Sequence, residues 1–190
     1  MLAARLGVDA IGLVFYPPSS RYLSVSQAVA ILQVVPPFVT TVGLFLDADE
    51  KAIRQVLDSV ELDCLQFHGN ETDAFCRSFG RRYIKSVPMV DTDDIHAYTT
   101  RYPGAAGFLL DAVSNGEAGG KGETFDWGRI PQDLAKPLIL AGGLRPDNVA
   151  EAIRSTRCYA VDVSSGVEVE KGVKSPEKIR KFVEQVKSIQ

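Results

Sequence analysis

Two turns near the end of the chain have the composition of an anion-binding site. They lie in Leu138-Ile-Leu-Ala-Gly-Gly-Leu144 and in Tyr159-Ala-Val-Asp-Val-Ser-Ser-Gly-Val-Glu168, where an apolar run ends abruptly in small residues. Glycines let backbone N–H groups approach a ligand closely, and serine hydroxyls add further donors. If the two runs are successive strands of a β/α repeat, both turns lie at one edge of the sheet and form a phosphate cradle. The candidate ligands are Gly142, Gly143, Ser164, Ser165 and Gly166.

A carboxylate, Asp111, ends the apolar run Gly107-Phe-Leu-Leu110 and is a candidate general acid. At the top of a strand it would lie partly out of water, and desolvation raises the pKa of a carboxyl toward the range useful for proton donation. A helix cap or a solvated loop residue is the alternative. The glycine-rich segment 112–124 that follows suits a cover that closes over a ligand and excludes water. Plain surface disorder is the alternative for that segment.

Polar side chains also follow two of the earlier strand-like runs. Arg21 lies in a proline-containing loop, where its guanidinium could grip a carboxylate in a bidentate manner, and a solvated surface arginine is the alternative. Gln66 and His68 share one strand face with Cys64 by period-two alternation. His68 would stand nearest the mouth, where it could bind a substrate hydroxyl or carboxylate or serve a structural role. Cys64 would lie ~13 Å below His68, as a small core residue.

The elements that would position these side chains alternate between strand-like and helix-like. Short continuous apolar runs, typical of parallel sheets covered by helices, are separated by stretches with helical apolar spacing. Ser24 with Gln27 and Asp47 with Glu50 predict capping boxes at two helix starts. The strand-like runs are Asp9–Phe15, Thr40–Leu46, Cys64–Phe67, Tyr83–Val87, Gly107–Leu110, Leu138–Leu140 and Tyr159–Val163.

Alternating β and α units predict an α/β fold with a parallel sheet, and their number favours a (β/α)8 TIM barrel over an open sheet. The count is one strand short. Residues 1–6 read as the end of a helix with Gly7 as its left-handed terminator, so we expect a barrel that lacks its first strand and the start of its first helix. The alternative is an open seven-stranded sheet. With no internal linker, residues 1–190 read as a single domain.

Composition argues against several kinds of partner. The chain is 45% hydrophobic and 24% charged, which is ordinary for a globular domain, and its net charge of -3 gives no basic field for nucleic acid or membrane. No apolar stretch reaches the ~20 residues that span a bilayer, and the N-terminus lacks the features of a secretory signal. Three cysteines without a C-x-x-C pair predict neither a metal site nor a disulfide and fit the cytoplasm.

Several stretches, in order along essentially the whole chain, carry a family pattern. They are Asp9-Ala-Ile-Gly-Leu-Val-Phe-Tyr16 with Ser20-Arg-Tyr22, Leu65-Gln-Phe-His-Gly69, Leu110-Asp111, Gly119-Gly120 through Phe125-Asp126-Trp127, Ala141-Gly-Gly-Leu144 with Pro146 and Asn148-Val149, and Val161-Asp-Val-Ser-Ser-Gly-Val-Glu168. In these stretches the chain resembles the phosphoribosylanthranilate isomerases of tryptophan biosynthesis.

The resemblance implies a (β/α)8 barrel that works without metal or organic cofactor. The implied reaction is the Amadori rearrangement of N-(5-phosphoribosyl)anthranilate to 1-(2-carboxyphenylamino)-1-deoxyribulose 5-phosphate. It implies that Asp111 is the general acid that protonates the ribose ring oxygen and that Arg21 holds the anthranilate carboxylate. The phosphate would be held by Gly142, Gly143, Ser164 and Ser165, and Gln66, His68 and Gly166 complete the predicted substrate-binding set.

The chain departs from the family pattern in two places. Lys121 stands where the family usually has a small hydroxylated residue. The family's first strand, a Lys-Ile-Cys-Gly-Ile-Thr-like segment whose cysteine is the general base, has no match here. One acid–base group is typically worth ~10²–10⁴-fold in rate, so we expect this chain alone to be inactive or badly impaired. Its partner would be a small phosphoribosyl substrate, and we expect a monomer or a homodimer.

Other functions remain compatible with parts of the sequence. Another phosphosugar barrel, such as an aldose–ketose isomerase of histidine biosynthesis or a ribulose-phosphate epimerase, would need a second catalytic carboxylate or a metal at the mouth. Arg21, the long loop after Asp111 and the single well-placed carboxylate argue against those enzymes. A non-enzymatic phosphate-binding module, or a barrel fragment completed by another chain, is the remaining alternative.

Overall fold

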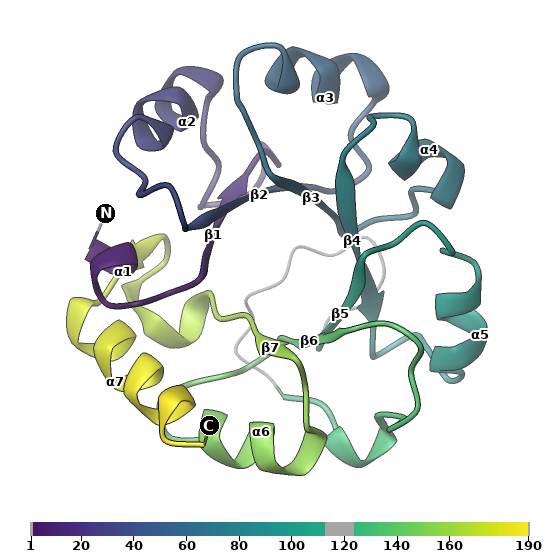
Figure 1. Ribbon diagram of the computed structural model, residues 1–190, viewed down its shortest axis with the longest axis vertical. Coiled ribbons are helices and arrows are strands. Elements are labelled where there is room, and N and C mark those ends of the chain that lie inside the picture. Colours follow the sequence, from purple (N-terminus) through teal and green to yellow (C-terminus); the bar gives the residue numbers. More distant parts are fainter. Residues whose placement is uncertain (1, 113–123, 190) are drawn as a thin grey trace.

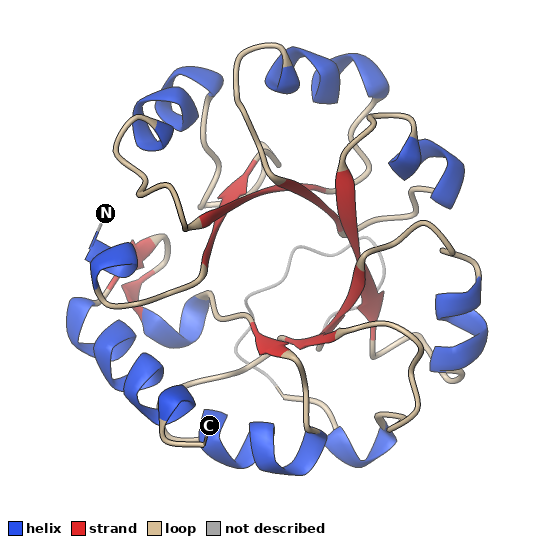
Figure 2. Cartoon of the chain, in the orientation of Figure 1, coloured by secondary structure: helices blue, strands red, loops and turns tan. Residues whose placement is uncertain are grey.

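The protein is described from a computed structural model that covers residues 2–112 and 124–189. Its main sheet is parallel, and the strands lie side by side in the order in which they occur along the chain. The sheet curls into a ring with the helices on its outside (Figures 1 and 2). Its strands are β1 (Ala10–Val14), β2 (Thr40–Phe45), β3 (Cys64–Phe67), β4 (Arg82–Pro88), β5 (Gly107–Asp111), β6 (Leu138–Leu140) and β7 (Ala160–Val161).

All seven strand predictions are confirmed, because each apolar run lies where a strand is found. The predicted α/β fold with a parallel sheet is confirmed, but the barrel is not. Among the described residues β1 and β7 are the two edges of the sheet, and Figure 2 shows the ring open between them. The structure therefore establishes a curled, seven-stranded parallel sheet. A barrel that lacks its first strand is a finer statement that the sheet does not confirm.

The outer layer consists of helices, and at α2, α3, α4, α5 and α7 the N-cap side chain accepts a hydrogen bond from the backbone. At α2 the predicted capping box is confirmed, since Ser24 Oγ accepts from Gln27 N and Ser24 N donates to Gln27 Oε1. At α3 the prediction is wrong: Asp49 caps the helix, and Asp47 takes a left-handed conformation with φ 48°. The helices are α1 (Leu2–Arg5), α2 (Val25–Leu32), α3 (Glu50–Leu57), α4 (Asp73–Arg77), α5 (Ile95–Thr100), α6 (Val149–Thr156) and α7 (Pro176–Lys187). None of these described helices is long and apolar enough to cross a bilayer.

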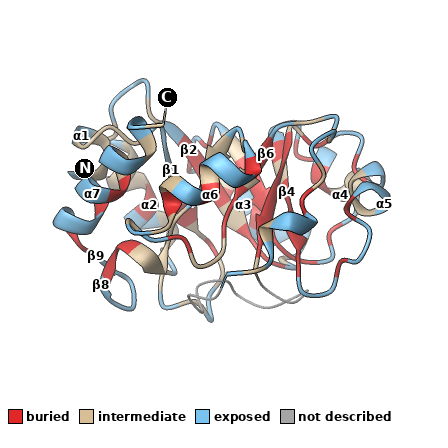
Figure 3. Cartoon of the chain, turned by 90° about the horizontal axis from the view of Figure 1, so that it is seen from below, coloured by how far each residue is buried: buried red, intermediate tan, exposed pale blue. Residues whose placement is uncertain are grey.

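The core lies between the ring of strands and the helices. Alternate side chains of the strands pack against the helices in the hydrophobic core. The side view in Figure 3 shows buried residues along the strands of the ring. Phe15, directly after β1, stacks on Phe45 of β2 at a centroid distance of 5.4 Å. Phe67 of β3 packs against Phe45 in a tilted arrangement at 6.1 Å and stacks on Phe79 beyond α4. The alternate set of side chains, including Gln66, faces the inside of the ring. This alternation decides which side chains reach the mouth.

A charged pair is buried in this outward-facing layer. Lys85 of β4 is fully buried, and its Nζ lies 3.1 Å from Oε2 of Glu71, whose side chain is 3% exposed. The ammonium also donates to the carbonyl of Phe67, and Glu71 accepts from the backbone N–H groups of Asp47 and Gly69. The pair therefore ties the loops that leave β2 and β3 to the wall of the ring.

A small antiparallel hairpin near the C-terminus was not predicted from the sequence. It consists of β8 (Glu168–Glu170) and β9 (Val173–Lys174), preceded by the 3₁₀ turn η2 (Ser165–Val167) and joined through Gly172, which has φ 85°. A second 3₁₀ turn, η1 (Trp127–Arg129), is capped by Asp126, whose side chain accepts from the backbone N–H of Gly128. The predicted cover at 112–124 and Lys121 fall almost wholly on residues 113–123, outside the described residues.

Candidate active site

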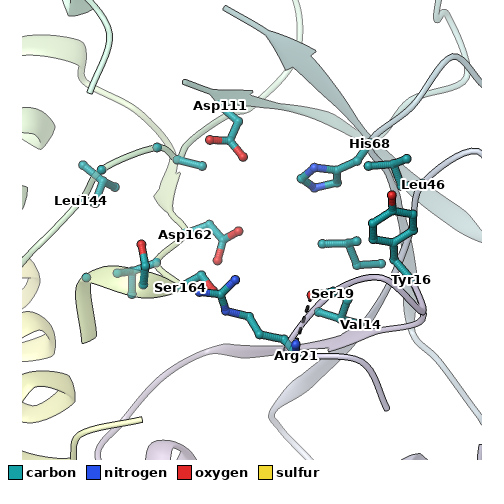
Figure 4. A pocket seen from close by; sticks show the side chains of 17 residues that line it. Val14, Tyr16, Ser19, Arg21, Leu46, His68, Asp111, Leu144, Asp162 and Ser164 are labelled. Carbon is teal, nitrogen blue, oxygen red and sulfur yellow. Dashed lines mark hydrogen bonds between the residues drawn. The ribbon is translucent and has the colours of Figure 1, made fainter. Parts of the chain in front are cut away.

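A pocket opens where the parallel strands end, at the carboxyl edge of the ring. Its wall combines Arg21 and Ser19 after β1, His68 after β3, Asp111 at the end of β5, the turn after β6, and the segment from Asp162 to Gly166 after β7. Figure 4 shows Asp111, Asp162, His68 and Arg21 pointing inward from different sides. The space amounts to about 720 Å³, part of it open to solvent. A concave site with a few convergent polar groups suits a small molecule.

The turn after β6 is built on two glycines in left-handed conformations. Gly142 and Gly143 have φ values of 82° and 61°. A Cβ on Gly142 would lie 2.6 Å from the backbone nitrogen of Ala112 and 3.1 Å from Oδ1 of Asp111, so only glycine fits beside the end of β5. Asn148 Nδ2 donates to the carbonyl of Gly143 at 3.1 Å and fixes the turn. The absence of side chains leaves its backbone next to the candidate acid.

The turn after β7 packs directly on the turn after β6. A Cβ on Gly166 would lie 1.8 Å from the carbonyl oxygen of Leu144, so the two backbones are in contact there. Ser164 and Ser165 belong to the pocket wall together with Gly142 and Gly143. The structure therefore brings together the five residues that the sequence offered as a phosphate cradle.

Gly166→Ala is expected to spoil this cradle. The new methyl group would overlap the Leu144 carbonyl, and because that atom is backbone, the two turns must move apart. Overpacking of this kind costs ~1–3 kcal/mol, and displaced donors should weaken binding of inorganic phosphate by roughly 10-fold or more. Phosphate titration followed by NMR measures the effect. Gly12→Ala is the matched control, since a Cβ there meets nothing within 4 Å; equal affinities in the two variants would contradict the contact.

Asp111 has the properties of a proton donor. The residue is 7% exposed and ends β5 at the pocket. Burial, followed by the negative charge of Asp162, raises the pKa of Asp111 to about 6, against an opposing hydrogen bond from the backbone of Ala112. A carboxyl with this pKa carries a proton for part of the time near neutral pH, as general acid catalysis requires.

Asp162 is a second carboxylate at the mouth, and the sequence analysis missed it. It faces the pocket opposite His68 and beside Asp111 in Figure 4. Desolvation by the neighbouring walls raises the pKa of Asp162, although the residue as a whole stays exposed at the mouth, and Lys174 opposes the rise. The expectation of a single well-placed carboxylate is therefore wrong. Period-two alternation with Ser164 at the end of the run Tyr159–Val163 is the signal that could have found Asp162.

Replacing Asp162 should shift the pH dependence of any reaction that needs protonated Asp111. The negative charge of Asp162 helps to hold the Asp111 proton, so Asp162→Asn lowers the pKa of Asp111 while burial keeps it above its ordinary value. The alkaline limb of the kcat profile, expected near pH 6, then moves to lower pH, and the rate at pH 7 falls. Asp133→Asn at an exposed position should leave the profile unchanged. An unmoved alkaline limb in Asp162→Asn would refute the coupling.

His68 reaches the pocket as a neutral imidazole. Burial, reinforced by the positive charge of Lys85, lowers the pKa of His68 to about 3. Its Nε2 lies 2.8 Å from Oε1 of Gln66, which fits Nε2–H donating to Gln66 and leaves Nδ1 as an acceptor toward the pocket. Gln66 does not belong to the pocket wall and acts on His68 instead. Cys64, one step lower, is also outside the wall, and burial raises its pKa to about 11, so it is unreactive there.

Arg21 lies at the pocket in a bidentate ion pair that the sequence did not reveal. Its Nε and Nη2 donate to the two carboxylate oxygens of Glu168, each at 2.7 Å. The guanidinium is thus fixed at the wall with Nη1 remaining for a ligand. Within the described residues no group of three His, Cys, Asp or Glu side chains is gathered as metal ligands.

The sheet is curled and parallel, and a glycine turn and a serine turn lie beside a partly protonated carboxyl at the carboxyl ends of its strands. These features define a class of β/α proteins that bind a small anionic molecule at that edge. A family model described as N-(5'-phosphoribosyl)anthranilate isomerase matches residues 2–185. The chain belongs to that family, the isomerases of tryptophan biosynthesis.

Named relatives and solved structures agree with this membership. The chain is 53% identical to N-(5'-phosphoribosyl)anthranilate isomerase of Pseudomonas fluorescens strain Pf-5 over 98% of this chain and 89% of that protein. The Thermotoga maritima isomerase structure matches with a TM-score of 0.87 and 38% identity, over 98% and 92% of the two chains. A further isomerase structure, in complex with reduced 1-(o-carboxyphenylamino)-1-deoxyribulose 5-phosphate, has a TM-score of 0.78 and 34% identity, over 98% and 91%.

These comparisons do not support the expectation that the chain is inactive or badly impaired for want of a strand. The matches extend over nearly all of this chain and 89–92% of the relatives just described. The comparisons also do not support the alternative assignments to an aldose–ketose isomerase of histidine biosynthesis or a ribulose-phosphate epimerase, because the matching family model is that of the anthranilate isomerase.

Proposed function

We propose that the pocket catalyses the Amadori rearrangement of N-(5-phosphoribosyl)anthranilate with Asp111 as the general acid. The observation that carries the proposal is the placement of Asp111, whose pKa is raised to about 6, in direct contact range of the Gly142 turn. A phosphate held by that turn and by Ser164 would leave the ribose between the turn and His68. The isomerase relative that holds the reduced product analogue supports a phosphoribosyl ligand of this size and charge.

The acid step fits the groups at the mouth. The Asp111 proton passes to the ribose ring oxygen as the bond from that oxygen to C1 breaks, and the nitrogen lone pair forms the C1=N bond of a Schiff base. Asp111 is then a carboxylate. The C2 proton passes to a base as the C1=C2 bond forms and the C1=N electrons return to nitrogen, and transfer of the proton from the C2 hydroxyl with protonation of C1 gives the 2-keto sugar. Neutral His68 offers an acceptor for a ribose hydroxyl, and Arg21 Nη1 offers donors for the anthranilate carboxylate.

Binding and turnover together test this function. The protein should bind reduced 1-(o-carboxyphenylamino)-1-deoxyribulose 5-phosphate in calorimetry, and inorganic phosphate should compete. It should also convert N-(5-phosphoribosyl)anthranilate to the ketose, followed by the loss of substrate absorbance. Analogue binding without conversion would favour the phosphate-binding module, and neither binding nor conversion would reject the proposal.

We also propose that one further parallel strand closes the ring between β1 and β7. Support comes from the two edges, which lie on either side of one gap in Figure 2, and from Gly12, whose absent Cβ would meet nothing within 4 Å inside the ring. A strand in the gap would hydrogen-bond to both edges and remove them. Amide hydrogen exchange in the purified protein tests this, because the gap-facing amides of β1 should then exchange slowly. Rapid exchange there would favour the open sheet.

The oligomeric state is proposed to be monomer or homodimer. The Thermotoga maritima isomerase is a dimer from which monomers have been generated, and this supports the second possibility for the present chain. Light scattering at several concentrations distinguishes the two.

A further inference from the structure

The two ends of the pocket are joined by a network centred on one buried carboxylate. Glu168, the first residue of β8, has a side chain that is 5% exposed. On one side it receives the two parallel hydrogen bonds from Arg21 described above. On the other side Lys174 Nζ of β9 lies 3.0 Å from Oε1 of the same carboxylate. One oxygen of Glu168 therefore serves both cations.

Lys174 continues the network into the phosphate turn. Its Nζ donates to the carbonyl oxygen of Ser164 at 2.8 Å and lies 3.4 Å from Ser164 Oγ. A chain of contacts thus runs from Arg21 through Glu168 and Lys174 to Ser164. Arg21 and Glu168 are 147 residues apart in sequence, so only the fold brings these groups together.

The hairpin is built so that Glu168 stays in place. The carbonyl of Glu168 accepts from Lys178 Nζ of α7 at 2.7 Å. At the other end of the hairpin, a Cβ on Gly172 would lie 2.9 Å from the carbonyl of Ser20, so the hairpin turn rests against the loop that carries Arg21. The carboxylate is therefore fixed from the helix side and from the Arg21 side.

The charges of the network keep Glu168 ionised. Burial alone would raise the pKa of Glu168, but hydrogen bonds from Arg21 and Lys174 outweigh it and hold the pKa at about 2. Glu168 therefore remains ionised at neutral pH between two cations. Two cations, Arg21 and Lys174, thus flank the Glu168 carboxylate at this wall, and Lys174 also acts on Asp162 across the pocket.

We propose that Glu168 is a positioning residue that couples the carboxylate-binding and phosphate-binding ends of the pocket, holding Arg21 directly and the Ser164 turn through Lys174. The inference rests on the proposed function, because it assigns the two ends to the anthranilate carboxylate and the phosphate. Glu168 itself touches neither group. Its loss should therefore weaken both ends of the ligand at once.

Two ligands allow the effects at the carboxylate-binding and phosphate-binding ends of the pocket to be measured separately. One is reduced 1-(o-carboxyphenylamino)-1-deoxyribulose 5-phosphate, and the other is the same compound without the ring carboxylate. Glu168→Gln should bind the first on the order of 10- to 100-fold more weakly than the unaltered protein, because charge-assisted bonds to Arg21 are lost. It should bind the second roughly 3- to 10-fold more weakly, because Lys174 no longer anchors Ser164. Glu170→Gln in the same hairpin is the matched control and should bind both normally.

The outcomes decide between coupling and simpler roles. A decarboxylated ligand that binds Glu168→Gln as tightly as the unaltered protein would show that Glu168 serves Arg21 alone and would overturn the coupling. Normal binding of both ligands would overturn any positioning role. If the unaltered protein binds neither ligand, the proposed function fails as well, which is a different result from failure of Glu168→Gln alone.

Lys174→Met provides a second variant should Glu168→Gln not fold. The Lys174 side chain is 41% exposed, so its replacement leaves the core intact. It should weaken the decarboxylated ligand roughly 3- to 10-fold, with Lys171→Met as the control from the same turn. In the free protein, the ¹⁵N signal of Arg21 Nε should also shift in Lys174→Met. An unchanged Nε signal together with unchanged affinity would overturn the proposal without reference to turnover.

Discussion

Asp111→Asn is expected to lower kcat for the isomerisation by ~10²–10⁴-fold, the usual contribution of a single acid–base group. The amide is nearly isosteric and keeps the hydrogen-bonding shape of the pocket, but it has no proton to give to the ring oxygen. Because the side chain is 7% exposed and lies at the pocket, the substitution should leave the analogue affinity within a few-fold of the original. The measurement is steady-state kinetics at pH 6, with calorimetry on the same preparation.

Two controls distinguish loss of the proton donor from loss of folding or from a general effect of removing a carboxylate. Thermal unfolding of Asp111→Asn should stay close to that of the unaltered protein, since the substitution removes a buried group that prefers to be neutral. Asp147→Asn, which alters an exposed carboxylate in the loop after the phosphate turn, should retain normal kcat. A kcat for Asp111→Asn within about 3-fold of normal would remove Asp111 from the acid step and leave the proposed mechanism without its proton donor.

Lys85→Met should destabilise the protein by ~3–5 kcal/mol, the usual cost of removing one partner from a buried ion pair. The loss is large because Glu71, with 3% of its side chain exposed, would remain charged without its cation. Methionine fills much of the lysine volume, so the change reports mainly on charge. Urea unfolding measures the difference, and Lys51→Met on the exposed face of α3 is the control.

A second substitution tests whether the unpaired charge of Glu71 causes the loss of stability in Lys85→Met. Glu71→Gln added to Lys85→Met restores neutrality and keeps an oxygen that accepts from the N–H groups of Asp47 and Gly69. The double variant should therefore be more stable than Lys85→Met alone. Equal stability of the two would assign the loss to packing, and a loss below about 1 kcal/mol in Lys85→Met would show that the pair is not effectively buried.

Local patterns in the sequence predict most of the fold and much of the site. Continuous apolar runs identify every strand of the main sheet, since a strand covered by helices needs no polar face. The two small-residue turns were rightly expected to meet, because parallel strands end at one edge. Asp111 could be singled out for the same reason: it is the first polar residue after the run that begins at Gly107.

What the sequence could not give depends on distant partners or on backbone conformation. Nothing near Lys85 indicates that Glu71 neutralises it, and nothing near Arg21 indicates Glu168. The capping box at Asp47 failed because that residue takes a positive φ, which moves the helix start to Asp49. Asp162 was overlooked although its strand was recognised, since a two-residue shift in where β7 ends decides whether it meets the pocket.

The agreement between spatial order and chain order in the main sheet bears on how the protein is made. Each new strand hydrogen-bonds to the one synthesised just before it, so a chain leaving the ribosome can bury successive β/α units without waiting for remote residues. The ion pair between Arg21 and Glu168 differs from the sheet contacts, because its partners lie 147 residues apart. The ligand site can therefore form only after the β8–β9 hairpin has been synthesised and Glu168 has paired with Arg21, which is translated near the beginning.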